Sequence, residues 1–287
     1  MFGLHNGYHH FNSFDGVKSL PYIMKKSNIR TGIIGKKHVG PDTVYPFDYS
    51  YTEEHNSVLQ VGRNITYMKI LTELFFQSQP KDQPFFLYLG FHDPHRCGHT
   101  HPEYGNFCEK FGNGEPGMGW IPDWKPTYYD AKDVVVPPFV PDTPISRQDI
   151  AGQYTTISRL DQGIGLIINA LKQSGFYDNT LIIFTSDNGI PFPNGRTNLY
   201  DSGTRVPFVM SNPDTRLHNY NTSDQTFVSL LDITPTVLDW FSIPYPKHKL
   251  FHFDVKLTGK SLLSQSNKCD TVFGSHSLHE ITISNIK

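Results

Sequence analysis

Three short apolar segments divide the chain, and each ends directly at a cluster of polar side chains. The segments cover residues 31–35, 84–91 and 180–186, and their content of Ile, Phe and Tyr is typical of buried β-strands. Strands buried on both faces are typical of parallel sheets with helices on either side. We therefore expect an α/β fold with a largely parallel central sheet flanked by helices.

The segments between these strands have the spacing of amphipathic helices. Apolar residues recur every three or four positions from Ile150 to Leu171, and Gly175 follows where a helix commonly ends. Pro235 is expected to kink or restart the last helix. The sequence also predicts a short strand at 207–211. The predicted helices are, in chain order, 19–26, 64–79, 146–174 and 227–241.

The segment from 92 to 144 has little periodicity and many Gly, Pro, Trp and Tyr residues. Unstructured connections of this length are unusual in compact domains and are commonly functional or disordered. Its aromatic side chains favour an ordered segment, so we expect it to build one wall of a pocket. We find no linker before residue 243, and the remainder of the chain is rich in Pro, Lys and His.

Composition excludes two classes of partner. The formal net charge of −2 gives no basic field for nucleic acid. No apolar run approaches the roughly 18–20 residues that cross a bilayer, so we expect no membrane span. The first ten residues lack the basic and apolar regions of a secretory signal. The triplets beginning at Asn64 and Asn221 are nevertheless glycosylation sequons, which belong to the secretory pathway.

The three cysteines bear on the same question. Cys97 and Cys108 lie eleven positions apart around a loop rich in Gly and His, and we interpret them as a local disulfide. The alternative is a pair of reduced surface thiols. Cys269 then has no partner in the chain.

The polar clusters at the strand ends carry the candidate chemistry, because ligands of open α/β sheets bind at the carboxyl ends of the strands. Lys36 and His38 follow the first strand and would point to one side of an extended chain, where they suit a tetrahedral oxyanion. The residues from His92 to Arg96 follow the second strand and could supply a general acid and an anion-binding fork. The alternative for both clusters is a solvated polar turn.

Asp187 and Asn188 follow the third strand and offer oxygen ligands for a hard cation such as Ca²⁺ or Mg²⁺. Asp-Asn-Gly is also an ordinary turn sequence, which is the alternative here. Arg196 lies eight positions further on and could return to this edge as another anion contact, although a loop Arg is commonly only solvated.

Together these motifs resemble the sulfatase family of the alkaline-phosphatase-like superfamily. Gly35-Lys36-Lys37-His38 resembles the family's G-K-x-H, the segment from Pro84 to Arg96 resembles its apolar strand ending in H-x-P-H, and Ser186-Asp187-Asn188-Gly189 resembles its S-D-N/H-G. The likeness covers most of the chain in the same order. It is greatest to members that remove N-linked sulfate from the glucosamine of heparan sulfate.

The resemblance implies roles for individual residues. Lys36 and His95 would hold the sulfate oxygens, His95 would also protonate the leaving nitrogen, and His38 would assist the nucleophile. Arg196 would lie near metal and sulfate, while Asp93 and Arg96 could contact the sugar. Asp187 and Asn188 would be ligands of one Ca²⁺ ion. The partner implied is a sulfated glycosaminoglycan, the setting lysosomal or secretory, and a homodimer is possible.

The sequence departs from the family at the nucleophile. Sulfatases oxidise the first residue of C-x-P-x-R or S-x-P-x-R to formylglycine, and no Cys or Ser here begins that pattern. We expect that motif, together with the other Ca²⁺ ligands, to lie upstream of Met1. We therefore interpret the chain as a fragment, with a partial catalytic domain at 1–243 and the start of a smaller C-terminal region at 244–287, and predict that it is inactive alone.

Three other interpretations remain open at this point. The complete protein could be a phosphodiesterase or phosphatase of the same superfamily, although Asn188 in place of a His disfavours two transition metals. It could be a non-catalytic pseudo-sulfatase that binds sulfated glycans. Finally, the clusters could be turns of an α/β domain without this chemistry, which would make four ordered motif matches accidental.

Overall fold

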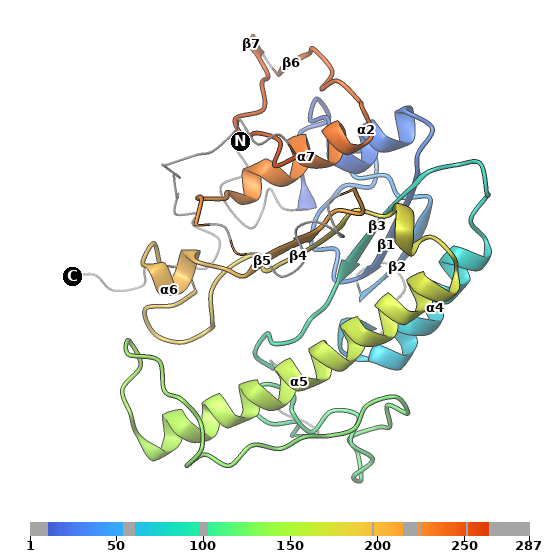
Figure 1. Cartoon of the computed structure of the whole chain (residues 1–287). Helices are drawn as coiled ribbons and strands as arrows, with labels where there is room; N and C mark the ends of the chain where they lie inside the picture. The colour runs from blue at the N-terminus through green and yellow to red at the C-terminus, as the bar shows by residue number, and fades with distance from the viewer. Residues whose placement is uncertain are drawn as a thin grey trace.

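The computed structural model describes residues 11–53, 61–97, 103–196, 198–214, 223, 225–250 and 252–263, and the account below concerns these residues (Figure 1). The sequons and cysteines include two positions outside them, Asn221 and Cys269. Among the described residues, no helix combines the length and the apolar character that crossing a bilayer requires.

The central sheet is parallel, as the apolar segments predict. Its strand order is β2 (Tyr49–Thr52), β1 (Arg30–Gly35) and β3 (Phe85–Gly90), and both pairings are parallel. A second pair, β4 (Ile182–Thr185) and β5 (Phe208–Ser211), is antiparallel. The short strand β2 was not predicted, because four residues of Tyr, Ser and Thr are too few to show a clear period.

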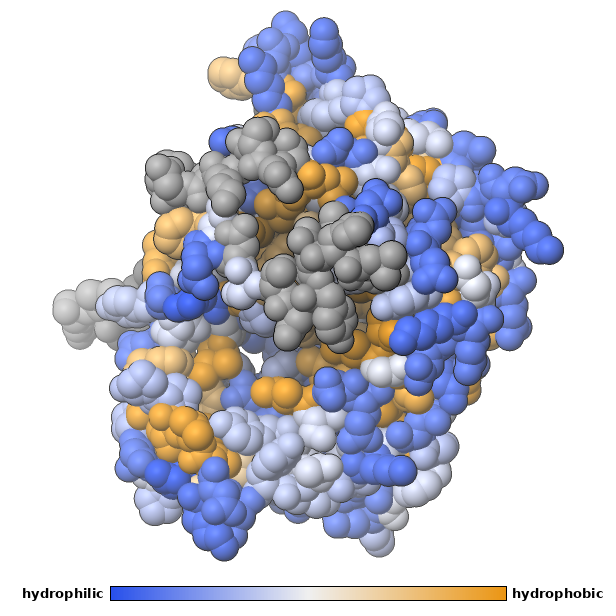
Figure 2. Space-filling view, in the orientation of Figure 1, coloured by the Kyte–Doolittle hydropathy of each residue, from blue (hydrophilic) through white to orange (hydrophobic). Residues whose placement is uncertain are grey.

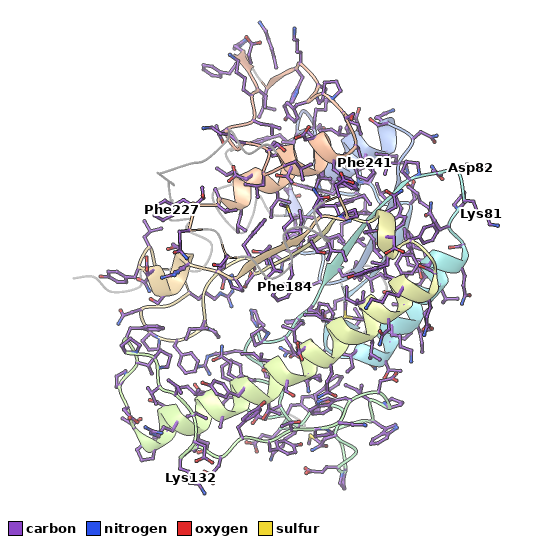
Figure 3. The ribbon with its side chains drawn as sticks, in the orientation of Figure 1. Lys81, Asp82, Lys132, Phe184, Phe227 and Phe241 are labelled. Atoms are coloured by element: carbon purple, nitrogen blue, oxygen red, sulfur yellow. A yellow bond between two sulfur atoms is a disulfide. The ribbon has the colours of Figure 1, made fainter. Side chains whose placement is uncertain are left out.

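Two helix layers cover the strands (Figure 1). Phe86 of β3 and Ile183 of β4 pack in one cluster with α2 (Leu20–Lys26) and α7 (Ile233–Trp240), and Phe241 after α7 joins it (Figure 3). On the other face, Phe85, Leu87 and Ile182 pack against α4 (Ile65–Gln77) and α5 (Pro144–Gln173). Since each cluster contains side chains from both β3 and β4, these strands lie together between the same two layers.

The long helices begin at capping side chains. Thr143 accepts a hydrogen bond from the backbone of Ser146 at the start of α5, and Pro144 occupies the first turn, where no donor is lost. Asn64 caps α4 in the same way by accepting from Tyr67. The remaining short elements are η1 (Val61–Arg63), η2 (Tyr177–Asn179), α6 (Asp201–Thr204), η3 (Leu230–Asp232), β6 (Lys249–Leu250) and β7 (Phe253–Asp254).

The structure corrects two details of the predicted pattern. The helix expected from 227 begins only at Ile233, which places Pro235 in the first turn, where a residue without a donor N–H is tolerated. Burial on both faces holds for β1 but not for β3 and β4, whose residues are half-buried or exposed. Tyr88 of β3 is 49% exposed and Val209 of β5 is 59% exposed.

The face of α5 that turns inward also differs from the prediction. In the first half of the helix, Ile157 is 41% exposed, whereas Arg159 is fully buried. The apolar spacing therefore identifies the helix correctly but not the residues that it buries there. The reason lies in the ion pairs of Arg159, which belong to the candidate site.

Candidate active site

The site begins where β1 and β3 end side by side. Gly35 and Gly90 are cross-strand partners, and a Cβ atom on Gly35 would lie 2.1 Å from the Gly90 carbonyl oxygen. Gly35 also has a φ of +99°, a conformation that residues with a side chain rarely adopt. The backbone N–H of Lys36 donates to the same Gly90 oxygen at 2.8 Å. These glycines hold Lys36 beside the segment that begins at His92.

The segments that follow β3 and β4 meet through His95 and Arg196. Nη1 of Arg196 lies 2.8 Å from Nε2 of His95, although the residues are 101 positions apart. Nδ1 of His95 lies 2.8 Å from the carbonyl oxygen of Arg96. The ring of His92 meets the ring of His95 edge to face, with centroids 5.1 Å apart. His92, His95 and Arg196 therefore converge as predicted. Lys36 lies close enough for its charge to affect the pKa of His95.

Electrostatics confirm that this is a crowded basic site. Burial, which opposes the charged form, lowers the pKa of His95 to about 4, although its hydrogen bond to the Arg96 carbonyl works in the opposite direction. The charges of Lys36, Arg196 and His92 lower this pKa further. His95 is therefore neutral over the pH range in which an ordinary histidine titrates.

Asp93 and Arg96 already have partners in the protein, and Asp93 is buried whereas the Arg96 side chain is 36% exposed. The side chain of Asp93 is 1% exposed and accepts hydrogen bonds from both Arg63 and Arg159. Arg96 donates from Nη1 to Asp149 at 3.0 Å and from Nε to the Pro191 carbonyl at 2.9 Å. The burial of Asp93 disfavours contact with a sugar, whereas the contact expected for Arg96 stays a prediction. Both residues hold the segment that carries His95.

Sequence reasoning missed the residues that hold the segment from His92 to Arg96 in place through hydrogen bonds. Arg63 donates to the His95 carbonyl at 2.8 Å as well as to Asp93, and its side chain is 2% exposed. Glu53 lies 3.0 Å from Nδ1 of His92, and this hydrogen bond lowers the pKa of Glu53 despite the opposing effect of burial. No local signal marked this network, because Arg159 lies outside the apolar spacing that identified the helix and its burial became evident only from the structure.

His38 does not follow the predicted geometry. Its φ of +50° lies in the left-handed region, so the chain is not extended from Lys36 to His38. The argument that both side chains point to one side because of strand alternation is therefore wrong. The His38 ring instead packs against Phe11, with centroids 5.2 Å apart.

Asp187 and Asn188 lie at the carboxyl end of β4 as predicted. The Asp187 side chain is exposed. Desolvation raises the pKa of Tyr88 in β3, and the charge of Asp187 raises it further. Two oxygen-bearing side chains at this edge fit part of the ligand set of a hard cation. Among the described residues there is no cluster of three or more His, Cys, Asp or Glu side chains that could hold a metal alone.

The segment after β3 is closed by the predicted disulfide. Cys97 and Cys108 are bonded, with Cα atoms 5.1 Å apart, and Cys108 is fully buried. The space-filling view is hollowed between the layer of α5 and the part of the chain that carries β4 and α6, and apolar side chains border the hollow (Figure 2). The Arg96 contacts to Asp149 of α5 and to Pro191 connect these two parts.

Comparison with known proteins decides the family. A model of the family described as Sulfatase matches residues 2–243. The chain belongs to the sulfatase family. It is 59% identical to human N-sulphoglucosamine sulphohydrolase over 288 aligned residues. The alignment covers 99% of this chain and 57% of the human protein. The chain thus spans little more than half the length of this relative.

Solved structures show the same sulfatase fold at low sequence identity. A putative sulfatase from Bacteroides fragilis superposes with a TM-score of 0.55 at 22% identity, covering 79% of this chain and 56% of that one. A protein solved with its substrate D-glucosamine-2-N,6-O-disulfate gives a TM-score of 0.58 at 15% identity, covering 91% and 66%. The predicted α/β fold of the alkaline-phosphatase-like type is confirmed.

Proposed function

We propose that the complete protein is a sulfatase that removes N-linked sulfate from the glucosamine of heparan sulfate. The observation that carries this proposal is the 59% identity to human N-sulphoglucosamine sulphohydrolase across nearly the whole chain. The basic cluster of Lys36, His95 and Arg196 is consistent with it, because a tetrahedral sulfuryl group needs several donors around its oxygens.

In this proposal each residue of the cluster acts on the sulfuryl group. Lys36 and Arg196 stabilise charge on its oxygens, and His95 supplies a proton to the leaving nitrogen. Such preorganised donors commonly contribute the largest share of catalysis, and the loss of one costs about 10²–10³ in rate. His38 assists the nucleophile, although its contact with Phe11 gives no direct support for that role.

Sulfatases use two further groups in catalysis, formylglycine and Ca²⁺. The nucleophile of the family is formylglycine, and none of Cys97, Cys108 and Cys269 is followed by its motif. Asp187 and Asn188 would hold Ca²⁺, which would supply positive charge beside the sulfuryl oxygens. Both groups stay proposals for the complete protein, as does the inactivity of this chain alone.

The setting proposed is the lysosome or the secretory pathway. The Cys97–Cys108 disulfide supports it, because such bonds persist in oxidising compartments. The Asn64 sequon lies at a half-buried helix start, and Asn221 falls outside the described residues. A sulfated glycosaminoglycan is the proposed substrate, and a homodimer and the division at residue 243 stay predictions.

The test compares substrates in the complete protein. Turnover of N-sulfated glucosamine should exceed that of 6-O-sulfated glucosamine and of a phosphate monoester. Turnover of the phosphate ester alone would support the phosphatase alternative. Glycan binding without turnover of any of the three, in a protein with an intact upstream sequence, would support the pseudo-sulfatase.

A further inference from the structure

The two hydrogen bonds of the His95 ring fix where its proton lies. A backbone carbonyl can only accept and a guanidinium can only donate. Nδ1, which faces the Arg96 carbonyl at 2.8 Å, therefore carries the hydrogen. Nε2, which faces Nη1 of Arg196 at 2.8 Å, therefore presents its lone pair. His95 is neutral here, and Arg196 occupies the nitrogen that a proton donor would use.

This state conflicts with the role that the proposed function gives to His95. A ring that accepts at Nε2 cannot donate there to the leaving nitrogen or to an oxyanion. Two changes are needed before it can: Arg196 has to leave Nε2, and that nitrogen has to take a proton from solvent. The charges that face the ring from neighbouring elements, those of Lys36, His92 and Arg196, all oppose the proton.

Groups further from the ring do not relieve this opposition. Glu53 is engaged with His92, and Asp149 is engaged with Arg96. Arg63 donates to the carbonyl of His95, and its guanidinium is paired with the buried carboxylate of Asp93. Among the described residues, no carboxylate contacts the His95 ring. The negative charge that would favour its protonation has to come from a ligand.

A tetrahedral oxyanion in the site would favour both the departure of Arg196 from Nε2 and the protonation of that nitrogen. It offers the guanidinium of Arg196 two oxygens in place of one nitrogen lone pair, and charged, forked hydrogen bonds of this kind are the stronger ones. It also adds negative charge within reach of Lys36 and the imidazole, which favours the charged form of the ring.

We propose that Arg196 is a positioning residue that keeps His95 neutral until a sulfate or sulfamate group draws its guanidinium away, so that Nε2 takes a proton from solvent only when the site is occupied. This inference rests on the proposed function for the identity of the anion. The inference that Arg196 keeps His95 neutral in the free protein rests on the two hydrogen bonds of the His95 ring alone.

The test measures the pKa of His95 by NMR of the chain labelled at histidine and lysine, with the His95 and Lys36 signals assigned from His95→Gln and Lys36→Gln variants. In the free protein, Arg196→Gln should raise this pKa by about one unit, which is a tenfold gain in proton affinity. Arg196→Lys keeps the charge but loses the fork, and should give a smaller rise. The control is Arg205→Gln, which removes an exposed guanidinium paired with Asp201 at 3.9 Å and should leave His95 unchanged.

Inorganic sulfate is the probe for the second half of the proposal. It should raise the pKa of His95 by at least one unit in the unaltered chain and by much less in Arg196→Gln. If the pKa of His95 is unchanged in Arg196→Gln without sulfate, and the spectrum shows that the variant is folded, Arg196 does not keep His95 neutral and that part of the proposal is overturned. If sulfate perturbs the Lys36 and His95 signals but leaves the pKa of His95 unchanged, the anion does not draw Arg196 away from His95. That result would overturn this step, while the proposed anion site would stand.

Failure of the proposed function has a different signature. If sulfate perturbs neither Lys36 nor His95 at any concentration, the anion site is wrong, and with it the release by substrate. The comparison of the free variants still decides whether Arg196 holds His95 neutral.

Discussion

Nε of Arg159 lies 2.7 Å from Oδ2 of Asp93 in the protein interior, and neither side chain is more than 1% exposed. A second bond joins Nη2 of Arg159 to Oδ1 of Asp93 at 3.0 Å. The same guanidinium donates to the carbonyls of Cys108 and Phe111. One side chain of α5 thus ties together the segment of His95 and the loop of the disulfide.

Removing this guanidinium should destabilise the fold strongly. Arg159→Gln leaves a buried carboxylate short of charge compensation, and breaking a buried pair in this way costs about 3–5 kcal/mol. Urea denaturation followed by circular dichroism measures the loss. Arg147→Gln is the matched control in the same helix, because its pair with Asp142 is exposed to solvent. Equal losses in the two variants would contradict a structural role for the buried pair.

Stability should depend on pH through His95. Its folded pKa of about 4 is lower than the ordinary 6.5, so the unfolded chain takes up this proton first as the pH falls. The contribution of the neutral ring is present above pH 6.5 and is lost as the pH falls towards 4. His95→Gln should therefore lose less stability than the unaltered chain between pH 7 and pH 4.5. Parallel pH dependences of the unfolding free energy in the two proteins would refute this.

The disulfide should contribute about 3 kcal/mol, because it closes a short loop and restricts the unfolded chain. We expect Cys97→Ala combined with Cys108→Ala to lower the free energy of unfolding by that amount, which urea denaturation shows as a lower midpoint. A reductant should bring the unaltered chain to the same midpoint and leave the double variant unaffected. A reductant effect on the double variant would show that another bond is responsible.

Asn64 gives a test that separates glycan from helix cap. In a secretory eukaryotic host, Asn64→Asp and Asn64→Ala should both lose the mass of one glycan. Only Asn64→Ala should lose about 1 kcal/mol of stability, since Asp still accepts the Tyr67 hydrogen bond at the start of α4. No difference in mass between either variant and the unaltered protein would show that the sequon is not used.

Calcium affinity should depend on Asp187. Isothermal titration of the complete protein with CaCl₂ should show weaker binding in Asp187→Ala, because a hard cation loses its carboxylate oxygen. Asp201→Ala is the control, since that exposed carboxylate lies after β4 but pairs with Arg205. Binding that is unchanged in Asp187→Ala, or lost equally in the control, would place the cation elsewhere.

The sequence predicts the layers of this fold well because strand and helix periods are local properties. Residues 31–35 and 84–91 become β1 and β3, and the helix predicted at 146–174 agrees with α5 to within two residues at each end. The start of α7 was wrong because a proline fits either a kink or a first turn, and local sequence does not separate the two.

The site was predictable only as far as strand ends converge. Lys36 and His95 follow β1 and β3, which end side by side in one sheet, whereas Arg196 reaches them from the loop after β4, which pairs with β5 in a separate sheet. The inward turn of Asp93 was not predictable, because it depends on Arg63 and Arg159, which lie 30 and 66 positions away. A motif shows which chemical groups are present, whereas their orientation is decided by partners from other elements.

The contact between Gly35 and Gly90 limits how this protein can be altered. A methyl group on either residue would overlap a backbone oxygen, so the two strands leave the sheet at a shared, side-chain-free point. Loop grafts or insertions for new specificity therefore have to begin beyond Lys36 and His92. An engineer who changes residues before that point would move both halves of the anion site at once.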